Sequence, residues 1–308
     1  MLVIDEAGKV TEAEFLVAAT RAKKWVIIGD HKQLPPYYDR KLEKIFSEVN
    51  EIRKSNKLSL LDPSILKISY FENLWNQLNT NKTKKSDKVN ARFVTLDVQR
   101  RMHPDLALFI SDMFYKNEYH SPNESEFIKE KTLDLTIFKY PATFIEVIPK
   151  GNQRFETNLN FASGQKLLKL SCKSGYANLM EAKKVIEILY SLIKEESIFA
   201  EQEQLKSKKD SAAVIGIIAF YAGQVELIRK LIKESDFLEA QEQSSNGQYL
   251  CKGKINVNVN TVDSFQGKEC SVIILSFTRS NPHRNIGFVD DANRLNVAMS
   301  RARKKLIL

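Results

Sequence analysis

Short apolar runs, each ending in polar or acidic residues, recur along this chain and predict buried strands. The first two runs are residues 2–4 and 25–28, and a stretch with helical spacing lies between them at residues 11–21. Thr11 has Glu14 three residues later, which is the spacing of a capping box and predicts the start of a helix. A strand, a helix and a strand in this order predict a right-handed βαβ unit and a parallel sheet.

The same alternation continues through the rest of the chain and predicts a second α/β domain. The pattern predicts strands at residues 93–97, 145–148, 214–220, 255–259 and 272–277, and helices at residues 71–78, 104–114, 178–193 and 224–233. Two polar stretches, residues 201–210 and 234–254, are expected to be exposed loops or insertions. A loose, lysine-rich stretch ends near Arg92, where we expect the domain boundary, so that residues 1–92 and 93–308 form two domains.

Composition narrows the class of protein. The chain has 308 residues, enough for two domains, and 43% of them are hydrophobic and 28% charged, as in soluble globular proteins. No apolar run approaches the ~20 residues of a membrane span, and no signal peptide fits the N-terminus. The three cysteines are far apart and indicate neither a disulfide framework nor a zinc site, so we expect a cytoplasmic protein, or a nuclear one in a eukaryote. The net charge of +9 is compatible with a phosphate-rich partner.

Two adjacent carboxylates, Asp5 and Glu6, follow the first apolar run. At the carboxyl end of a parallel strand they would lie where α/β sheets bind nucleotides. An aspartate there can hold Mg²⁺, directly or through water, and the next glutamate can position or deprotonate an attacking water. An ordinary strand that ends in a solvated acidic turn has the same pattern, so the pair by itself leaves both interpretations open.

Two further clusters carry side chains suited to phosphate. Residues 29–36 follow the second strand and contain Gln33, an amide that could contact a terminal phosphate or its attacking water. Residues 99–104 contain Arg101, whose planar guanidinium can bridge phosphoryl oxygens from across a cleft. Taken singly, the first cluster also fits a plain turn with a bystander glutamine, and the second fits a solvated basic face.

The last two clusters lie in the C-terminal part of the chain. Residues 261–269 combine hydroxyl, amide and carboxylate groups that could contact nucleic-acid phosphates and a nucleotide ribose. Residues 293–303 form a helical pattern in which Arg294 and Arg301 lie two turns apart on the same side. A basic helix of this kind can equally be a solvated surface.

In this order, the five clusters resemble the motifs of superfamily 1 helicases, in the branch that contains the nonsense-decay RNA helicase, senataxin and related DNA helicase-nucleases. Residues 5–6 resemble motif II, 29–35 motif III, 99–104 motif IV, 261–269 motif V and 293–303 motif VI. The resemblance implies an α/β protein of tandem RecA-like parallel-sheet domains with the P-loop NTPase fold, the first domain being incomplete. It also implies an ATP-dependent helicase or translocase that uses ATP and Mg²⁺ and acts on single-stranded RNA or DNA.

The resemblance assigns roles at the nucleotide. It implies that Asp5 binds Mg²⁺, that Glu6 activates water and that Gln33 senses the γ-phosphate. Two arginines of the second domain, Arg101 and Arg301, are then arginine fingers. The remaining nucleotide-binding residues are Gln266 and Gly267, which line the cleft, Glu269, which contacts the ribose, and Arg294, which contacts phosphate or orients its helix.

On the nucleic-acid face, the resemblance implies that Thr261 and residues 219–221 contact the strand backbone. Tyr221 is expected either to stack on a base, which contributes ~1 to 3 kcal/mol without sequence preference, or to cap its strand structurally.

Three departures from the family pattern change the expectation. Arg100 replaces the usual aromatic residue before the finger, and Ala219-Phe220-Tyr221 replaces Thr-Pro-Tyr. No G-x-x-x-x-G-K-[ST] loop occurs in the chain, so we expect a fragment that carries motifs II to VI, cut at both ends, with the N-terminal half of the motor in the same or a separate chain. The isolated fragment is then expected to be inactive. The alternative is a non-catalytic remnant that retains nucleic-acid or protein binding.

Overall fold

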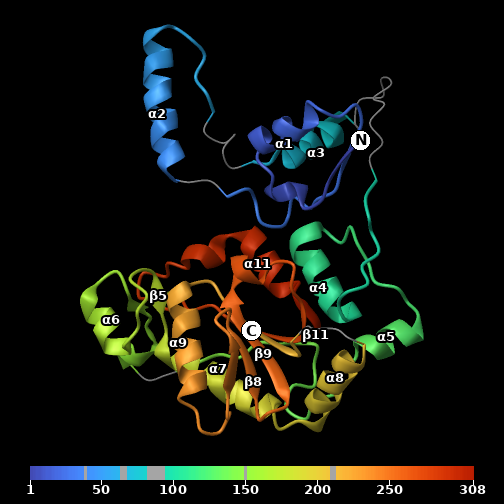
Figure 1. The fold of residues 1–308 in the computed structure, drawn as a ribbon, viewed down its shortest axis with the longest axis vertical. Helices are drawn as coiled ribbons and strands as arrows, with labels where there is room; N and C mark the ends of the chain where they lie inside the picture. The colour runs from blue at the N-terminus through green and yellow to red at the C-terminus, as the bar shows by residue number, and fades with distance from the viewer. Residues whose placement is uncertain (38–39, 63–67, 82–93, 149–150, 209–212) are drawn as a thin grey trace. The chain divides into compact units, whose positions relative to one another are not determined.

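The computed structural model describes residues 1–37, 40–62, 68–81, 94–148, 151–208 and 213–308. The chain divides into two compact units, unit 1 at Met1–Val94 and unit 2 at Thr95–Leu308 (Figure 1). The domain boundary predicted near Arg92 lies outside the described residues. None of the helices within these ranges is both long enough and apolar enough to cross a membrane.

Unit 1 is built on two short parallel strands, β1 (Leu2–Ile4) and β2 (Trp25–Ile27), joined through α1 (Glu12–Ala19). The Thr11 hydroxyl accepts a hydrogen bond from the Glu14 N–H at 3.2 Å, and the Glu14 carboxylate accepts one from the Thr11 N–H at 2.9 Å. These bonds to Thr11 lower the pKa of Glu14. The predicted βαβ unit and its capping box are therefore confirmed.

The other elements of unit 1 are a 3₁₀ turn, η1 (Ala7–Lys9), and two helices, α2 (Arg40–Ser55) and α3 (Tyr70–Asn81). Helix α3 confirms the helix predicted at residues 71–78. Helix α2 was not predicted, although Ile45, Val49 and Ile52 recur there at helical spacing. Charged residues lie between these apolar positions, and the helical spacing was therefore not recognised.

Unit 2 contains a seven-stranded sheet with the order β3-β11-β10-β6-β9-β8-β7. The first five strands in this order pair in parallel, and the last two form an antiparallel hairpin at the edge. The strands are β3 (Ala142–Thr143), β6 (Ile215–Ala219), β7 (Gln241–Ser244), β8 (Gln248–Cys251), β9 (Ile255–Thr261), β10 (Cys270–Ser276) and β11 (Ala302–Ile307). The predicted α/β class with a parallel sheet is confirmed.

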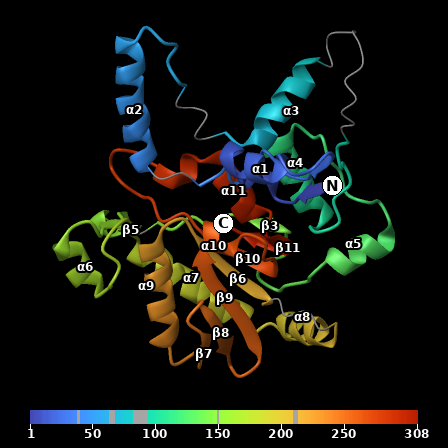
Figure 2. The same cartoon turned by 45° about the horizontal axis from the view of Figure 1, so that its top comes forward.

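Helices cover both faces of this sheet. On one face α7 (Leu179–Leu192) and α9 (Ala222–Lys233) pack against each other and against the central strands, and Figure 2 shows α9 running beside the sheet. The opposite face carries α4 (Pro104–Tyr115), α10 (Val262–Phe265) and α11 (Ala292–Met299), and α8 (Glu196–Ser207) packs against β9.

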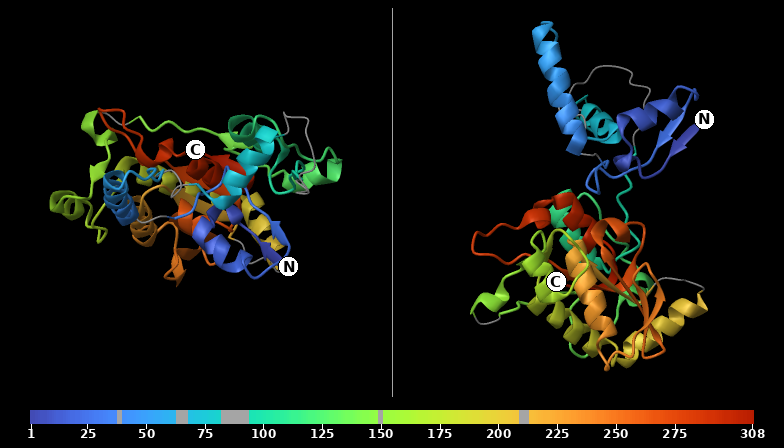
Figure 3. Two further views of the ribbon diagram at one scale, coloured as in Figure 1. Left: turned by 90° about the horizontal axis from the view of Figure 1, so that it is seen from above. Right: turned by 60° about the vertical axis from the view of Figure 1, so that its left-hand side comes forward.

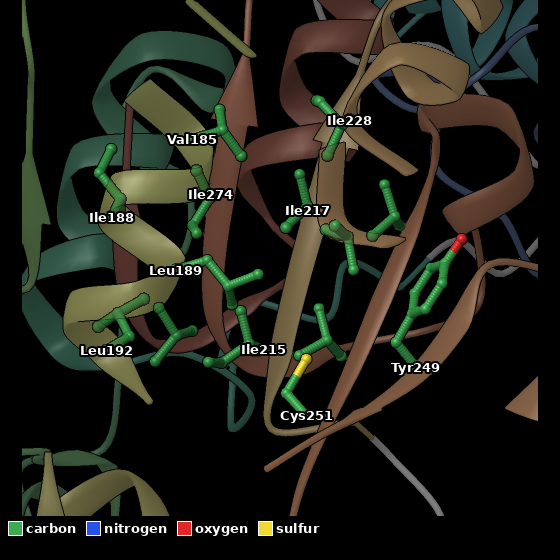
Figure 4. Close-up of a cluster of buried hydrophobic side chains, with 14 of the residues drawn as sticks. Val185, Ile188, Leu189, Leu192, Ile215, Ile217, Ile228, Tyr249, Cys251 and Ile274 are labelled. Atoms are coloured by element: carbon green, nitrogen blue, oxygen red, sulfur yellow. The ribbon is translucent and has the colours of Figure 1, made fainter. Parts of the chain in front are cut away.

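Period-two alternation along β6 assigns its side chains to the two faces. Ile215 and Ile217 belong to the cluster built by α7 and α9, shown in Figure 4. Gly216 lies between them and faces α10, where an added Cβ would lie 2.7 Å from the Phe265 ring. Glycine therefore allows α10 to approach the sheet closely.

Smaller elements complete unit 2. They are α5 (Ser125–Lys131), η3 (Gly151–Arg154), β4 (Thr157–Asn158), α6 (Ala162–Leu168), β5 (Tyr176–Ala177) and η4 (Gly287–Asp290). Strands β4 and β5 pair with each other, and α6 lies at the margin of unit 2 in both views of Figure 3.

Two strand predictions were wrong. Residues 94–97 form no strand, and Val98 makes only an isolated bridge with His120. Residues 145–148 form no strand; the strand that pairs with the end of β11 is β3, a few residues earlier. The Ile145 N–H still donates a hydrogen bond to the Leu308 carbonyl at 2.7 Å.

The two polar stretches, predicted as exposed loops or insertions, contain regular elements that the pattern did not indicate. Residues 234–254 contain the β7–β8 hairpin, and residues 201–207 belong to α8. Glu201 is buried there because its carboxylate accepts hydrogen bonds from Ser271 at 2.6 Å and Lys304 at 2.7 Å. These hydrogen bonds compensate the free-energy cost of burying a charge. The sequence pattern does not show which partners a residue will have.

Candidate functional site

In unit 1, the two predicted carboxylates occupy the turn that follows β1. Asp5 and Glu6 are exposed, and an Asp5 carboxylate oxygen accepts the Glu6 N–H at 2.8 Å. Glu6 has φ of 53°, a left-handed conformation that is uncommon for residues other than glycine and clusters at functional sites. The turn leads directly into η1, and the Ala7 N–H donates to the Ile28 carbonyl at 2.8 Å.

The turn after β2 lies against this acidic turn. An added Cβ on Gly8 would fall 2.7 Å from the Asp30 carbonyl, and one on Gly29 would fall 3.0 Å from the Gly8 nitrogen. On the same turn, Asp30 accepts a hydrogen bond from the Gln33 side-chain amide at 3.1 Å. The structure therefore brings the segments of Asp5, Glu6 and Gln33 together at the carboxyl edge of the two strands.

Helix α3 contacts the turn after β2, which the sequence pattern did not indicate. The His31 and Trp75 rings stack with centroids 4.9 Å apart. The apolar spacing of α3 predicted an amphipathic helix but did not indicate which residues it would contact.

In unit 2, Glu269 joins two arginines. Its carboxylate lies 2.6 Å from the Nε of Arg101 and accepts hydrogen bonds from Arg303 at 2.8 and 2.5 Å. Burial raises the pKa of Glu269, but the hydrogen bonds from Arg303 and the positive charge of Arg101 outweigh it, so that the pKa is lowered. Arg303, two residues beyond the predicted finger, was not predicted to take part, because its side chain meets Glu269 through the pairing of β10 with β11.

Arg301, the other predicted finger, is 2% exposed. Its guanidinium donates to the Val297 carbonyl at 3.0 Å and to the Lys268 carbonyl at 3.5 Å. Arg101 donates to the Ser300 carbonyl at 3.5 Å. Unit 2 thus assembles Arg101, Glu269 and Arg301 from three predicted clusters at one place.

Gln266 and Gly267 form the turn that leads to this assembly. Gly267 has φ of 77° and no neighbouring atom within 4 Å of an added Cβ, so conformation rather than space requires glycine there. Gln266 is partly buried beside it. Both therefore lie on the short connection between α10 and Glu269.

A cavity of about 250 Å³ lies next to the Arg101–Glu269–Arg303 cluster within unit 2. Its lining is polar and charged, with more cations than carboxylates, and includes Arg100, Arg101, Lys131, Gln204, Glu269 and Arg303. Arg100 extends into solvent, with its side chain 66% exposed and 3.9 Å from Glu124.

Arg294 is held by two carboxylates. Its guanidinium donates to Asp291, the N-cap of α11, at 3.1 Å and lies 3.4 Å from Asp263 of α10. These contacts tie Arg294 to the start of its own helix and to α10, and its role, phosphate contact or orientation of the helix, stays a prediction.

The two predicted nucleic-acid contacts lie at the ends of adjacent strands. Thr261, opposite Ala219, caps α10 by accepting the Ser264 N–H at 3.4 Å. Tyr221 follows β6 but is only 5% exposed, and its ring packs on Tyr176 and Phe288. In this arrangement Tyr221 offers no open ring face to a base.

Within the described ranges, no group of three or more histidine, cysteine or acidic side chains is placed to hold a metal ion. The donor chemistry of Asp5 and Glu6 nevertheless suits Mg²⁺, which prefers oxygen ligands, keeps several waters and takes others from phosphate. Two exposed carboxylates are compatible with that mode of binding.

Comparison with known proteins gives matches over the whole chain. Two family models, each described as an AAA domain, match residues 66–308 and residues 1–41. An uncharacterized ATP-dependent helicase of Methanocaldococcus jannaschii is 28% identical over 100% of this chain and 35% of its own length. The regulator of nonsense transcripts 1 homolog of Arabidopsis thaliana is 29% identical over 100% of this chain and 19% of its own length.

The probable helicase senataxin of Homo sapiens is 27% identical over 100% of this chain and 9% of its own length. The chain therefore spans about a third or less of these relatives. Among solved structures, the Arterivirus nonstructural protein 10 helicase matches with a TM-score of 0.35 and 14% identity, over 99% of this chain and 37% of that one.

Proposed function

This chain belongs to the AAA domain family of superfamily 1 helicases, and from that membership we propose that it is the part of an ATP-dependent helicase or translocase that carries motifs II to VI. We further propose single-stranded RNA or DNA as the partner. The single observation that carries the proposal is the assembly of Arg101, Glu269 and Arg301 in unit 2.

The charges of this assembly suit a phosphate chain. The guanidiniums of Arg101 and Arg303 pair with the one carboxylate of Glu269, and the Arg301 guanidinium bonds the carbonyl of the preceding residue, Lys268. The positive charge in excess can stabilise the negative charge of a transferring phosphoryl group, a contribution of ~10³ to 10⁵ in rate for arginine fingers. In this proposal Arg101 and Arg301 are the fingers, Glu269 accepts a ribose hydroxyl, and Gln266 and Gly267 line the nucleotide.

Unit 1 would supply the groups that bind Mg²⁺, activate water and contact the γ-phosphate. We assign Mg²⁺ binding to Asp5, water activation to Glu6 and γ-phosphate contact to Gln33, because all three lie on adjacent turns at one edge of the β1–β2 sheet. Bound Mg²⁺ would neutralise charge on the phosphoryl oxygens. The lack of a side chain at Gly8 and Gly29 allows the two turns to approach each other closely.

Exposed apolar side chains on unit 1 support the proposal of a further part of the motor. Parallel strands are normally covered on both faces, yet Val3, Trp25 and Val26 are 54%, 47% and 43% exposed. We propose that an α/β segment with a phosphate-binding loop, in the same or a separate chain, covers these strands. The chain by itself would then turn over little or no ATP.

The test is Mg²⁺-dependent ATP hydrolysis, with and without single-stranded RNA or DNA, by the purified chain alone and by the chain co-expressed with a segment that carries such a loop. The proposal expects turnover only in the second case, and expects Arg301→Ala to abolish it. Hydrolysis by the chain alone would refute its incompleteness.

A second candidate function is nucleic-acid or protein binding without turnover, favoured by the lack of a G-x-x-x-x-G-K-[ST] loop in the sequence. Strand affinity that falls steeply with salt, together with no ATP hydrolysis in any combination, would support it.

A further inference from the structure

The hydroxyl of Tyr221 lies under a distant turn of the chain. It accepts a hydrogen bond from the Phe288 N–H at 3.1 Å. An added Cβ on Gly287 would lie 2.1 Å from the same oxygen, and Gly287 has φ of 58°. The backbone of this turn therefore closes on the hydroxyl so tightly that only glycine fits.

A buried arginine, itself paired with a buried carboxylate, also bonds the hydroxyl. Arg279 donates to it at 3.3 Å and lies 3.1 Å from the Glu156 carboxylate. The side chains of Arg279 and Glu156 are 8% and 5% exposed, and the Arg279 guanidinium lies 4.0 Å above the Tyr176 ring. The Tyr221 oxygen is thus held by Arg279 as well as by the turn.

The contacts continue from this turn to α11. The Phe288 ring lies 5.1 Å from the Tyr221 ring, and the Arg294 guanidinium lies 5.1 Å from the Phe288 ring. Arg294 in turn fixes the start of α11, and Arg301 follows the end of that helix, with its Nε bonded to the Val297 carbonyl.

We propose that Tyr221 is a positioning residue whose hydroxyl couples the strand-end edge of β6 and β9, where Thr261 lies, to helix α11. This inference rests on the proposed function for the strand and finger roles of Thr261 and Arg301. A displacement of the edge by a bound nucleic acid would move the Tyr221 oxygen, and the Phe288 N–H, Phe288 and Arg294 would carry that displacement to the helix.

Hydrogen–deuterium exchange of the full 308-residue chain tests the local contact. Tyr221→Phe removes only the hydroxyl, and we expect amides at residues 286–291 to exchange roughly fivefold faster, as for the loss of one hydrogen bond. Gly287→Ala, which attacks the contact from the other side, should have the same local effect. The matched control is Tyr249→Phe, because the buried Tyr249 hydroxyl makes no hydrogen bond within the described residues.

Exchange at residues 286–291 that is the same in wild type and Tyr221→Phe overturns the inference. Equal acceleration in Tyr249→Phe also does, since it would reflect general loosening of unit 2.

Adding saturating oligo(dT) tests the coupling itself, with binding measured separately by fluorescence anisotropy. We expect bound oligonucleotide to slow exchange at residues 292–299 in the wild type and in Tyr249→Phe but not in Tyr221→Phe. Binding without protection of α11, or equal protection in Tyr221→Phe, overturns the coupling. Failure of every variant to bind oligo(dT) or oligo(U) instead contradicts the strand binding of the proposed function, and the exchange of residues 286–291 still decides the hydroxyl contact.

Discussion

The guanidinium of Arg101 lies 2.6 Å from the carboxylate of Glu269, so a predicted finger is paired with the predicted ribose contact. A nucleotide bound as we propose would have to compete with this ion pair for both side chains. Arg303 holds the other carboxylate oxygen and would keep Glu269 in place after Arg101 has left.

Glu269→Gln should destabilise unit 2 by about 1 kcal/mol at pH 7, because a neutral amide cannot compensate Arg101 and Arg303 and the pair is partly exposed. The folded pKa of Glu269 lies below its usual value of 4.5. Its stabilisation is therefore present above that value and is lost as pH falls through the folded pKa.

Urea unfolding at a series of pH values between 7 and 3 checks this prediction. The difference between wild type and Glu269→Gln should shrink in the acid range, whereas the exposed control Glu203→Gln should stay close to wild type throughout. A constant difference at all pH values would contradict the role of the Glu269 charge.

Arg301→Lys should lower strand-stimulated ATP hydrolysis by ~10³ or more when measured together with the phosphate-binding segment. Lysine keeps the charge but cannot bond the Val297 and Lys268 carbonyls from one planar group. The exposed Arg284→Lys is the matched control. Turnover within a few-fold of wild type would remove Arg301 from the proposed site.

His103 should make the stability of unit 2 depend on pH. Its Nδ1 accepts the Asp105 N–H at 3.2 Å at the start of α4, which requires the neutral ring. Burial lowers the pKa of His103 below its usual 6.5, although the Asp105 carboxylate acts in the opposite sense. The stabilisation is thus present above 6.5 and is lost as pH falls through the folded pKa.

We expect His103→Asn, which keeps a capping acceptor but does not titrate, to flatten the decline in unfolding free energy between pH 7.5 and 5. His283→Asn, at an exposed position, should leave the decline unchanged. Identical profiles for wild type and His103→Asn would show that His103 does not cause it.

Thr11→Ala should speed amide exchange in α1 and cost unit 1 about 1 kcal/mol, because the capping box with Glu14 is lost. Thr11→Ser retains the hydroxyl and should behave like wild type. Hydrogen exchange of residues 12–19 measures both, and equal exchange in Thr11→Ala would mean that packing alone fixes the helix.

The sequence by itself determined the central strands and the order of the functional clusters. Strands β6 and β10 are nearly continuous apolar runs, as is typical of parallel strands covered on both faces, and Thr11 followed by Glu14 has the spacing that predicts the start of a helix. It did not determine α8 as a helix packed on the sheet, because the polar residue Glu201 is buried only by virtue of Ser271 and Lys304.

Tertiary structure alone decided the surroundings of the candidate residues. The sequence places Tyr221 at a strand end, but a turn 67 residues later closes over its hydroxyl and buries the ring. Arg303 meets Glu269 for the same kind of reason, through the pairing of β10 with β11. The local sequence pattern indicates the chemistry available to each side chain. Its burial and its charge partners depend on segments that only the folded sheet brings together.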